Sequence, residues 1–195
     1  MPVLANDEAF SHHAPSWWGS PLIIYVEGAA FAILAVSYFY IWWNFGTWPP
    51  QRTHLPDLGV SSINLLVLAV SAAPFWNAAR LAQRYERPMV VGTWLALGVL
   101  LGIAAIVLRV LEFQALHTRF NSNAYGSITW TILAVHLAHL LAGTLQTMLI
   151  ALVMFVGPVE RKHYSDAAVV AAYWYFVVIS WVALYLIVFI APRLA

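Results

Sequence analysis

The sequence contains no cysteine, and few of its residues carry a charge. The absence of cysteine excludes disulfides, thiolate metal sites and a cysteine nucleophile. Charged residues make up 9% of the 195 residues, and hydrophobic residues make up 63%. In a typical soluble domain roughly a quarter of the residues are charged and roughly half are hydrophobic. This composition predicts an integral membrane protein. With a net charge of +1 there is no basic patch for nucleic acid, so that class of partner is excluded.

The first residues also lack the features of a cleaved leader. The stretch MPVLANDEAFSHHAP has neither a cationic region nor a small-residue cleavage site ahead of the first apolar run. We therefore expect that run to remain in the protein as a spanning helix.

Long apolar runs fill most of the chain. A helix needs about 20 mainly apolar residues to cross a bilayer, and five segments meet this requirement: 21–43, 60–82, 89–115, 125–156 and 166–191. The separators are short, polar and rich in proline or charge, so no soluble domain is expected between them. The sequence predicts an all-α membrane bundle of five transmembrane helices over residues 21–195, preceded by a tail of residues 1–20.

The distribution of lysine and arginine predicts the orientation of this bundle. Five spans place the two termini on opposite sides of the membrane. One side would hold five basic residues, Arg80, Arg84, Arg87, Arg161 and Lys162, and the other side three, Arg52, Arg119 and Arg193. Because cytoplasmic loops are enriched in lysine and arginine, we expect a cytoplasmic N-terminus and a periplasmic or external C-terminus.

Ionisable side chains inside membrane spans are costly, so each is a candidate for function. Arg109 and Glu112 stand three residues apart, on one helical face, where each can neutralise the other. We interpret them as an intramembrane ion pair. Glu27 has no cation within four residues. Its carboxyl is expected either to be protonated and bonded within its own bundle, or to face a polar channel of another protein.

His136 and His139 lie in the middle of the fourth span, three residues apart. A carboxylate di-iron bundle needs about four carboxylates, and axial haem ligation by two histidines needs two different helices. The sequence therefore favours polar contacts between helices for both histidines. A small membrane metalloenzyme that uses His136, His139, Glu27 and Glu112 as ligands is the alternative from another class.

The same stretch carries a resemblance to a known family. YGSITWTILAVHLAHLLAG, from Tyr125 to Gly143, combines Tyr125-Gly126-Ser127 with His136 and His139. This order is similar to the Tyr-Gly-Ser…His-x-x-His…Gly pattern of cytochrome c oxidase subunit III and its quinol-oxidase counterpart. Glu27 resembles the glutamate of the family's first conserved helix, and WPP, residues 48–50, resembles the loop that follows it.

Three later blocks extend the resemblance over nearly the whole chain. INLLVLAVSA is similar to the family's Leu-Asn-Thr helix, and RVLEF is similar to its Gln/Glu-x-x-Glu-Tyr/Phe motif, at Glu112. YWYFVVISWVALY follows the closing aromatic pattern at Trp174 and Trp181. The chain departs from these patterns at Tyr175 and Val178, where the family usually has His and Asp, and at Arg109, where it usually has Gln or Glu. Five helices correspond to the family's five-helix form.

The resemblance implies a non-catalytic accessory subunit of a haem–copper terminal oxidase in the respiratory chain of a bacterial inner membrane. It implies no cofactor in this chain except bound phospholipid, because haem and copper lie in the partner subunits I and II. A larger respiratory supercomplex is a further expected partner. Glu27 would support proton uptake or lie at an interface. Within the family, the accessory subunit of nitric oxide reductase is the alternative.

Overall fold

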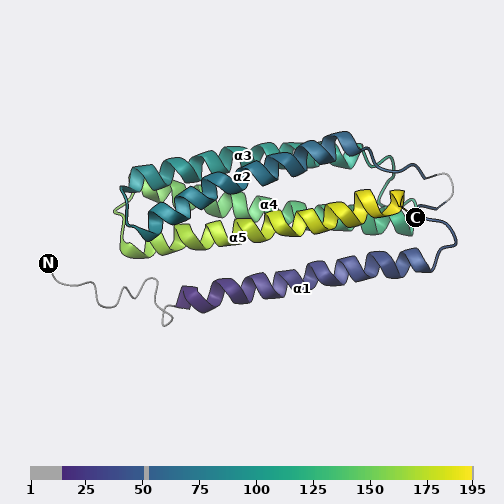
Figure 1. The fold of residues 1–195 in the computed structure, drawn as a ribbon, viewed down its shortest axis with the longest axis horizontal. Coiled ribbons are helices and arrows are strands. Elements are labelled where there is room, and N and C mark those ends of the chain that lie inside the picture. The colour runs from purple at the N-terminus through teal and green to yellow at the C-terminus, as the bar shows by residue number, and fades with distance from the viewer. Residues whose placement is uncertain (1–14, 51–52, 195) are drawn as a thin grey trace.

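The structure is a computed structural model in which residues 15–50 and 53–194 are described. In this part of the chain every regular element is helical (Figure 1). The helices are α1 (Pro15–Trp43), α2 (Leu58–Gln83), α3 (Pro88–Gln114), α4 (Ala124–Val156) and α5 (Arg161–Tyr185), and α5 continues through a π-helical turn, Leu186–Ile190, and a short 3₁₀ turn, Ala191–Arg193.

All five helices are long and apolar enough to cross a membrane. The predicted all-α architecture with five spans is therefore confirmed. The apolar part of the first helix, Pro21–Trp43, coincides with the predicted first span. Of the predicted N-terminal tail, residues 1–14 lie outside the described part of the chain, and residues 15–20 belong to α1.

Two helices begin earlier than the sequence predicted. α1 starts at Pro15, because proline is tolerated in the first helical turn, where its missing N–H is not needed. α5 starts at Arg161 rather than at residue 166, because Glu160 and His163 form a capping box in which the Glu160 N–H donates to His163 Nδ1 at 3.0 Å. Lys162 bonds the Glu160 carboxylate and lowers its pKa.

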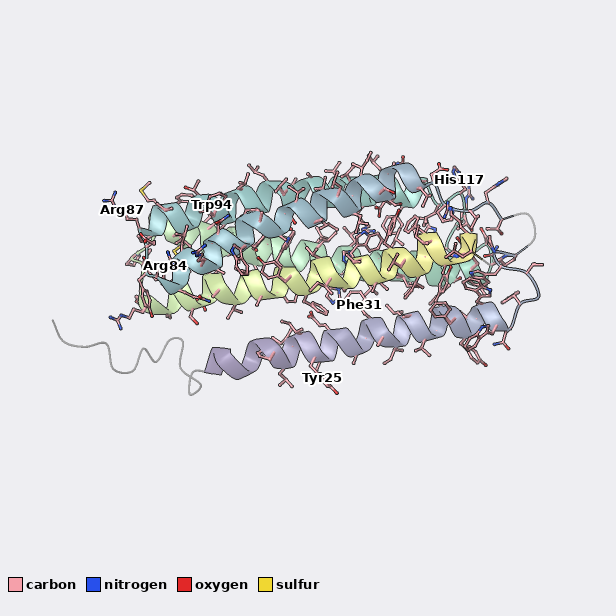
Figure 2. The ribbon with its side chains drawn as sticks, viewed as in Figure 1. Tyr25, Phe31, Arg84, Arg87, Trp94 and His117 are labelled. Carbon is pink, nitrogen blue, oxygen red and sulfur yellow. The ribbon has the colours of Figure 1, made fainter. Side chains whose placement is uncertain are left out.

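α2, α3, α4 and α5 form an antiparallel bundle, and α1 lies along its outside, packed chiefly on α4 and α5 (Figure 1). Among the α1 side chains that the structure describes, Phe31 and Tyr38 are buried, whereas Tyr25 is 77% exposed. Figure 2 shows Phe31 on the side of the bundle and Tyr25 on the opposite side. α1 is therefore attached along one face, and its other face is open to lipid or to another protein.

The α2–α3 and α4–α5 loops lie at the end of the bundle where α1 begins, and the α1–α2 and α3–α4 loops lie at the end where the chain finishes. We call these the α1-start end and the C-terminal end. Arg84 and Arg87 lie at the first and His117 at the second (Figure 2). The basic residues of the α2–α3 and α4–α5 loops therefore lie at the same end of the fold.

Close packing of α3 on its neighbours depends on two glycines four residues apart, Gly98 and Gly102. The Phe75 ring of α2 stacks on Trp174 of α5 with centroids 4.7 Å apart, and Gly98 faces that Phe75 ring. Gly102 faces Thr144 and Trp174. Small residues at this spacing let membrane helices approach closely, which strengthens their van der Waals contacts.

The substitution Gly98→Ala tests this packing. An alanine Cβ would lie 2.6 Å from Cε2 of Phe75, and such overpacking costs roughly 1–3 kcal/mol. Gly28→Ala on α1 is the matched control, because its nearest neighbour would be an ordinary contact at 3.7 Å. We expect a lower unfolding midpoint in an SDS titration for Gly98→Ala alone. Equal midpoints for the two variants would show that α3 does not depend on this contact.

Candidate functional site

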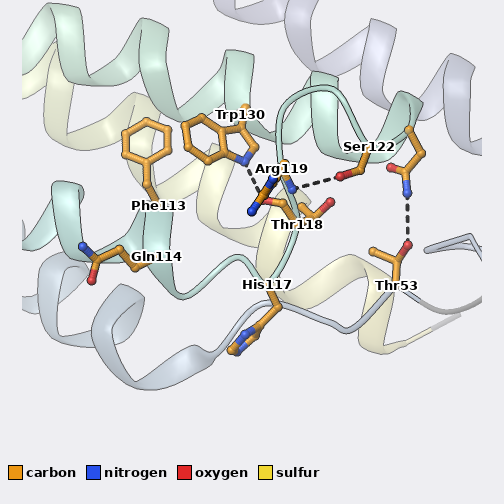
Figure 3. Close-up of a pocket in the computed structure, with 9 residues that line it drawn as sticks. Thr53, Phe113, Gln114, His117, Thr118, Arg119, Ser122 and Trp130 are labelled. Carbon is orange, nitrogen blue, oxygen red and sulfur yellow. Dashed lines mark hydrogen bonds between the residues drawn. The ribbon is translucent and has the colours of Figure 1, made fainter.

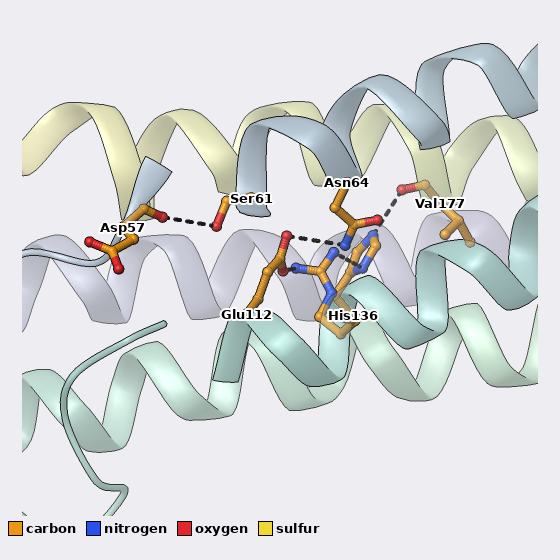
Figure 4. Close-up of polar contacts among 7 residues, drawn as sticks. Asp57, Ser61, Asn64, Glu112, His136 and Val177 are labelled. Atoms are coloured by element: carbon orange, nitrogen blue, oxygen red, sulfur yellow. Dashed lines mark hydrogen bonds and ion pairs between the residues drawn. The ribbon is translucent and has the colours of Figure 1, made fainter. Parts of the chain in front are cut away.

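A buried polar network connects four helices in the half of the bundle nearer its C-terminal end (Figure 4). Arg109 and Glu112 of α3 are fully buried and form an ion pair through Nη1 and Oε2. From α2, Asn64 Nδ2 donates to Glu112 Oε1 at 3.1 Å. From α4, His136 accepts at Nδ1 from Arg109 Nη2 at 3.1 Å. We call Asn64, Arg109, Glu112 and His136 the buried network.

The contacts of His136 determine its tautomer. Its Nε2 lies 3.0 Å from the carbonyl oxygen of Val177 on α5, and a carbonyl can only accept, so Nε2 carries the proton. Its Nδ1 faces a guanidinium, which can only donate, so Nδ1 is unprotonated. His136 is therefore neutral, and both of its ring nitrogens are used inside the chain.

Trp181 of α5 completes the surroundings of Arg109. The guanidinium carbon lies 3.3 Å from the centroid of the Trp181 ring, and both side chains are fully buried. A cation over an indole face is attracted by the ring quadrupole, and the attraction grows when water is absent. Arg109 is thus held by a carboxylate, an imidazole and an aromatic face.

Glu27 and His139 form a second polar contact, between α1 and α4. His139 Nε2 lies 3.7 Å from Glu27 Oε2, and the side chains are 15% and 29% exposed, respectively. Phe31 packs on the His139 ring with centroids 4.7 Å apart. Glu27 and Tyr173 of α5 both line a cavity of about 250 Å³. The ionisable partner absent from the neighbourhood of Glu27 in sequence is supplied by another helix.

The hydrogen bond of His139 determines which of its ring nitrogens faces Glu27. His139 Nδ1 lies 2.6 Å from the carbonyl oxygen of Val135, so Nδ1 carries a proton and is engaged within α4. Nε2 is therefore the nitrogen that faces the Glu27 carboxyl, at a distance longer than a hydrogen bond. The two side chains lie within the spans of α1 and α4, so they form a polar contact between these helices inside the membrane.

The structure brings all five intramembrane ionisable residues named from the sequence into two neighbouring sets of contacts, which meet on α4. Among the residues that the structure describes, no three His, Cys, Asp or Glu side chains lie close enough together to hold a metal ion. Sequence reasoning missed Asn64, the Val177 carbonyl and Tyr173. An asparagine inside an apolar span could have been marked from sequence, but a backbone carbonyl leaves no trace there.

The other motif residues are structural. Tyr125 and Trp48 pack edge to face at 5.0 Å, and Trp48 Nε1 donates to Tyr38 on α1 at 3.0 Å. Gly126 lies against the backbone of Arg119, where a Cβ would collide with the carbonyl oxygen. These residues fix α1 and the α3–α4 loop at the C-terminal end of the bundle.

Three further residues of the aligned motifs make hydrogen bonds to a loop or to another helix. Ser127 Oγ donates to the Phe120 carbonyl at 2.7 Å, which fastens the α3–α4 loop to the first turn of α4. Trp174 is fully buried and donates to Ser71 Oγ on α2 at 2.8 Å. Tyr175 replaces the family's histidine, and its hydroxyl donates to the Ala72 carbonyl at 3.0 Å.

The coupling between Arg109 and Glu112 can be measured with a double-mutant cycle. Glu112→Gln alone leaves a buried guanidinium without its counter-charge, which costs roughly 3–5 kcal/mol. Changing Arg109→Gln as well removes the stranded charge, so we expect the double variant to be more stable than Glu112→Gln. The measurement is the SDS unfolding midpoint together with the yield of assembled protein. Equal losses in the single and double variants would show that the two side chains are not coupled.

Comparison with known proteins finds relatives that match most of the chain. The family model of cytochrome c oxidase subunit III matches residues 18–192. Cytochrome c oxidase subunit 3 of Synechocystis is 24% identical over 191 residues, which cover 94% of this chain and 80% of the relative. The Corynebacterium diphtheriae protein is 30% identical over 151 residues, covering 74% of this chain and 71% of the relative. The Triticum aestivum protein is 26% identical over 147 residues, and the chain spans 54% of its length. This chain belongs to the cytochrome c oxidase subunit III family.

Proposed function

We propose that the chain is a non-catalytic accessory subunit of a haem–copper terminal oxidase, where it stabilises the catalytic subunit and supports proton uptake. Membership of the subunit III family supports the first part. The observation that carries the second part is the Glu27–His139 pair, in which two ionisable side chains face each other within the membrane and are partly exposed. A polar contact that only holds two helices together would not need to be exposed.

The donor chemistry of the histidines supports an accessory role. Both nitrogens of His136 are occupied, by Arg109 and by the Val177 carbonyl. His139 has only Nε2 left, and that atom faces Glu27. A haem iron or copper ion held by histidine needs an imidazole nitrogen that has no other partner. We therefore assign the haem and copper of the complex to its partner subunits I and II.

The proposal includes a location and an orientation. The chain would lie in a bacterial inner membrane with its α1-start end in the cytoplasm, because that end carries Arg80, Arg84, Arg87, Arg161 and Lys162. Glu27 would then be on the cytoplasmic half of α1, the side from which a bacterial oxidase takes up protons. The open face of α1 offers a contact surface for the catalytic subunit, for lipid or for a larger respiratory assembly.

Replacing the Glu27 carboxyl separates an accessory role from a catalytic one. Loss of a catalytic acid or base lowers the rate by about 10²–10⁴-fold. For Glu27→Gln in the whole purified complex we expect an initial oxygen-consumption rate within about twofold of the wild type and a faster decay over many turnovers. His139→Gln should behave in the same way, because it removes the ionisable side chain that Glu27 faces.

Glu86→Gln is the control for this experiment, since Glu86 is an exposed carboxylate in the loop at the same end of the bundle. It should leave both the initial rate and the decay unchanged. Immediate loss of nearly all activity in an assembled Glu27→Gln complex with intact haem spectra would overturn the accessory role and place Glu27 on an essential proton path.

The assignment of metals to the partners is tested on the separated chain. We expect it to show no haem absorption and no stoichiometric copper or iron by metal analysis, because the ring nitrogens of His136 and His139 face partners inside the chain. One metal ion per chain that is lost in His136→Gln or His139→Gln would contradict this and would favour a small metalloenzyme.

A further inference from the structure

The loop between α3 and α4 closes a cavity of about 740 Å³ at the C-terminal end of the bundle (Figure 3). Its walls come from three places: Thr53 before α2, Phe113 and Gln114 at the end of α3, and the loop that leads to Trp130 in α4. The cavity is separate from the buried network and from the Glu27–His139 pair. Of its lining residues only Phe113 belongs to one of the family's aligned motifs, RVLEF.

Hydrogen bonds fix the shape of this cavity. Trp130 Nε1 donates to the Thr118 carbonyl at 2.8 Å. Asn123 caps α4 by accepting from Gly126 N at 2.8 Å, and its amide donates to Thr53 Oγ1 at 3.1 Å. Gly126 allows the Arg119 backbone to lie directly on α4. The loop is therefore tied to both α4 and the α1–α2 connection, and the cavity is formed before any ligand binds.

The cavity carries an unbalanced positive charge. Arg119 lines it, is exposed, and forms no salt bridge with any carboxylate in the described part of the chain. The only acidic residue in the two loops of this end is Asp57, and Asp57 is engaged with His117 at 2.9 Å. A guanidinium in this position is free to bind an anion, and its planar donors fit phosphate oxygens well.

The remaining lining suits the headgroup region of a membrane. The Phe113 and Trp130 rings, with centroids 4.7 Å apart, form an apolar wall, while the Gln114 amide and the Ser122 hydroxyl offer further donors. Tryptophan is favoured at this depth, because its ring is apolar and its N–H is polar. One wall of the cavity is thus apolar and the other is a set of hydrogen-bond donors.

An exposed apolar stripe leads from the cavity along α3 toward the middle of the membrane. Val110, Val107 and Ile103 precede Gln114 at steps of four, three and four residues, so they lie on its helical face. They are 50%, 55% and 47% exposed, respectively. A ligand that places an anionic group beside Arg119 can therefore lay a hydrocarbon chain on this stripe, which a free phosphate ion cannot do.

We propose that this cavity binds the headgroup of an anionic phospholipid, with Arg119 contacting the phosphate and one acyl chain lying along Val110, Val107 and Ile103. The site selects negative net charge, because Arg119 adds attraction for an anionic headgroup that a zwitterionic headgroup lacks. This assignment goes beyond the proposed accessory function and does not depend on the role of Glu27.

The test is lipid binding to the intact, delipidated complex, measured by native mass spectrometry with dioctanoyl phosphatidylglycerol and dioctanoyl phosphatidylcholine. One arginine near a membrane surface changes the affinity for an anionic lipid by about fivefold. We expect the wild type to prefer phosphatidylglycerol by at least about that factor. Arg119→Gln should abolish the preference, and Arg119→Lys should retain most of it.

Arg84→Gln is the matched control, because it removes one exposed arginine from the opposite end of the bundle (Figure 2). It should keep the full preference for phosphatidylglycerol. Equal binding of the two lipids in the wild type, or equal effects of Arg119→Gln and Arg84→Gln, would overturn the site. Displacement of phosphatidylglycerol by an excess of inorganic phosphate would overturn the role of the acyl stripe and assign the cavity to a free anion.

Discussion

The ion pair of Arg109 and Glu112 determines how four of the five helices are arranged. A charged side chain at the centre of a bilayer costs about 3 kcal/mol on insertion scales, so each charged atom has to find a partner inside the bundle. α3 supplies the pair, and its neighbours supply Asn64, His136 and the Trp181 ring. Moving any of these helices away would leave a buried polar group without a partner, which makes one arrangement much more favourable than the others.

α1 is attached by a different kind of contact. Its Glu27 carboxyl meets His139 at 3.7 Å, longer than a hydrogen bond, and both side chains are partly exposed. His139 is three residues from His136, so a single turn of α4 joins the buried network to the α1 contact. The bundle is therefore a fixed support, and the Glu27–His139 pair on its outside places two partly exposed ionisable side chains between α1 and α4. This division suits a subunit that assists a catalytic partner without performing the reaction.

Much of the fold could be predicted from the sequence, because span length and apolar content are local properties. The five spans and the three-residue spacing of Arg109 and Glu112 were read directly from the chain. The start of α5 was placed too late, because a capping box made of Glu160 and His163 extends the helix into a polar stretch. The partner of Glu27 was missed because His139 lies on another helix. Contacts between residues far apart in sequence depend on helix packing, which no local pattern encodes.

The most direct measurement is affinity purification of the chain from its own membranes in mild detergent, followed by identification of the proteins that come with it. An accessory oxidase subunit predicts stoichiometric recovery of the partner subunits that carry haem and copper, with the haem absorption in those partners. Recovery of the chain alone, or with partners that hold neither haem nor copper, would contradict its place in a terminal oxidase.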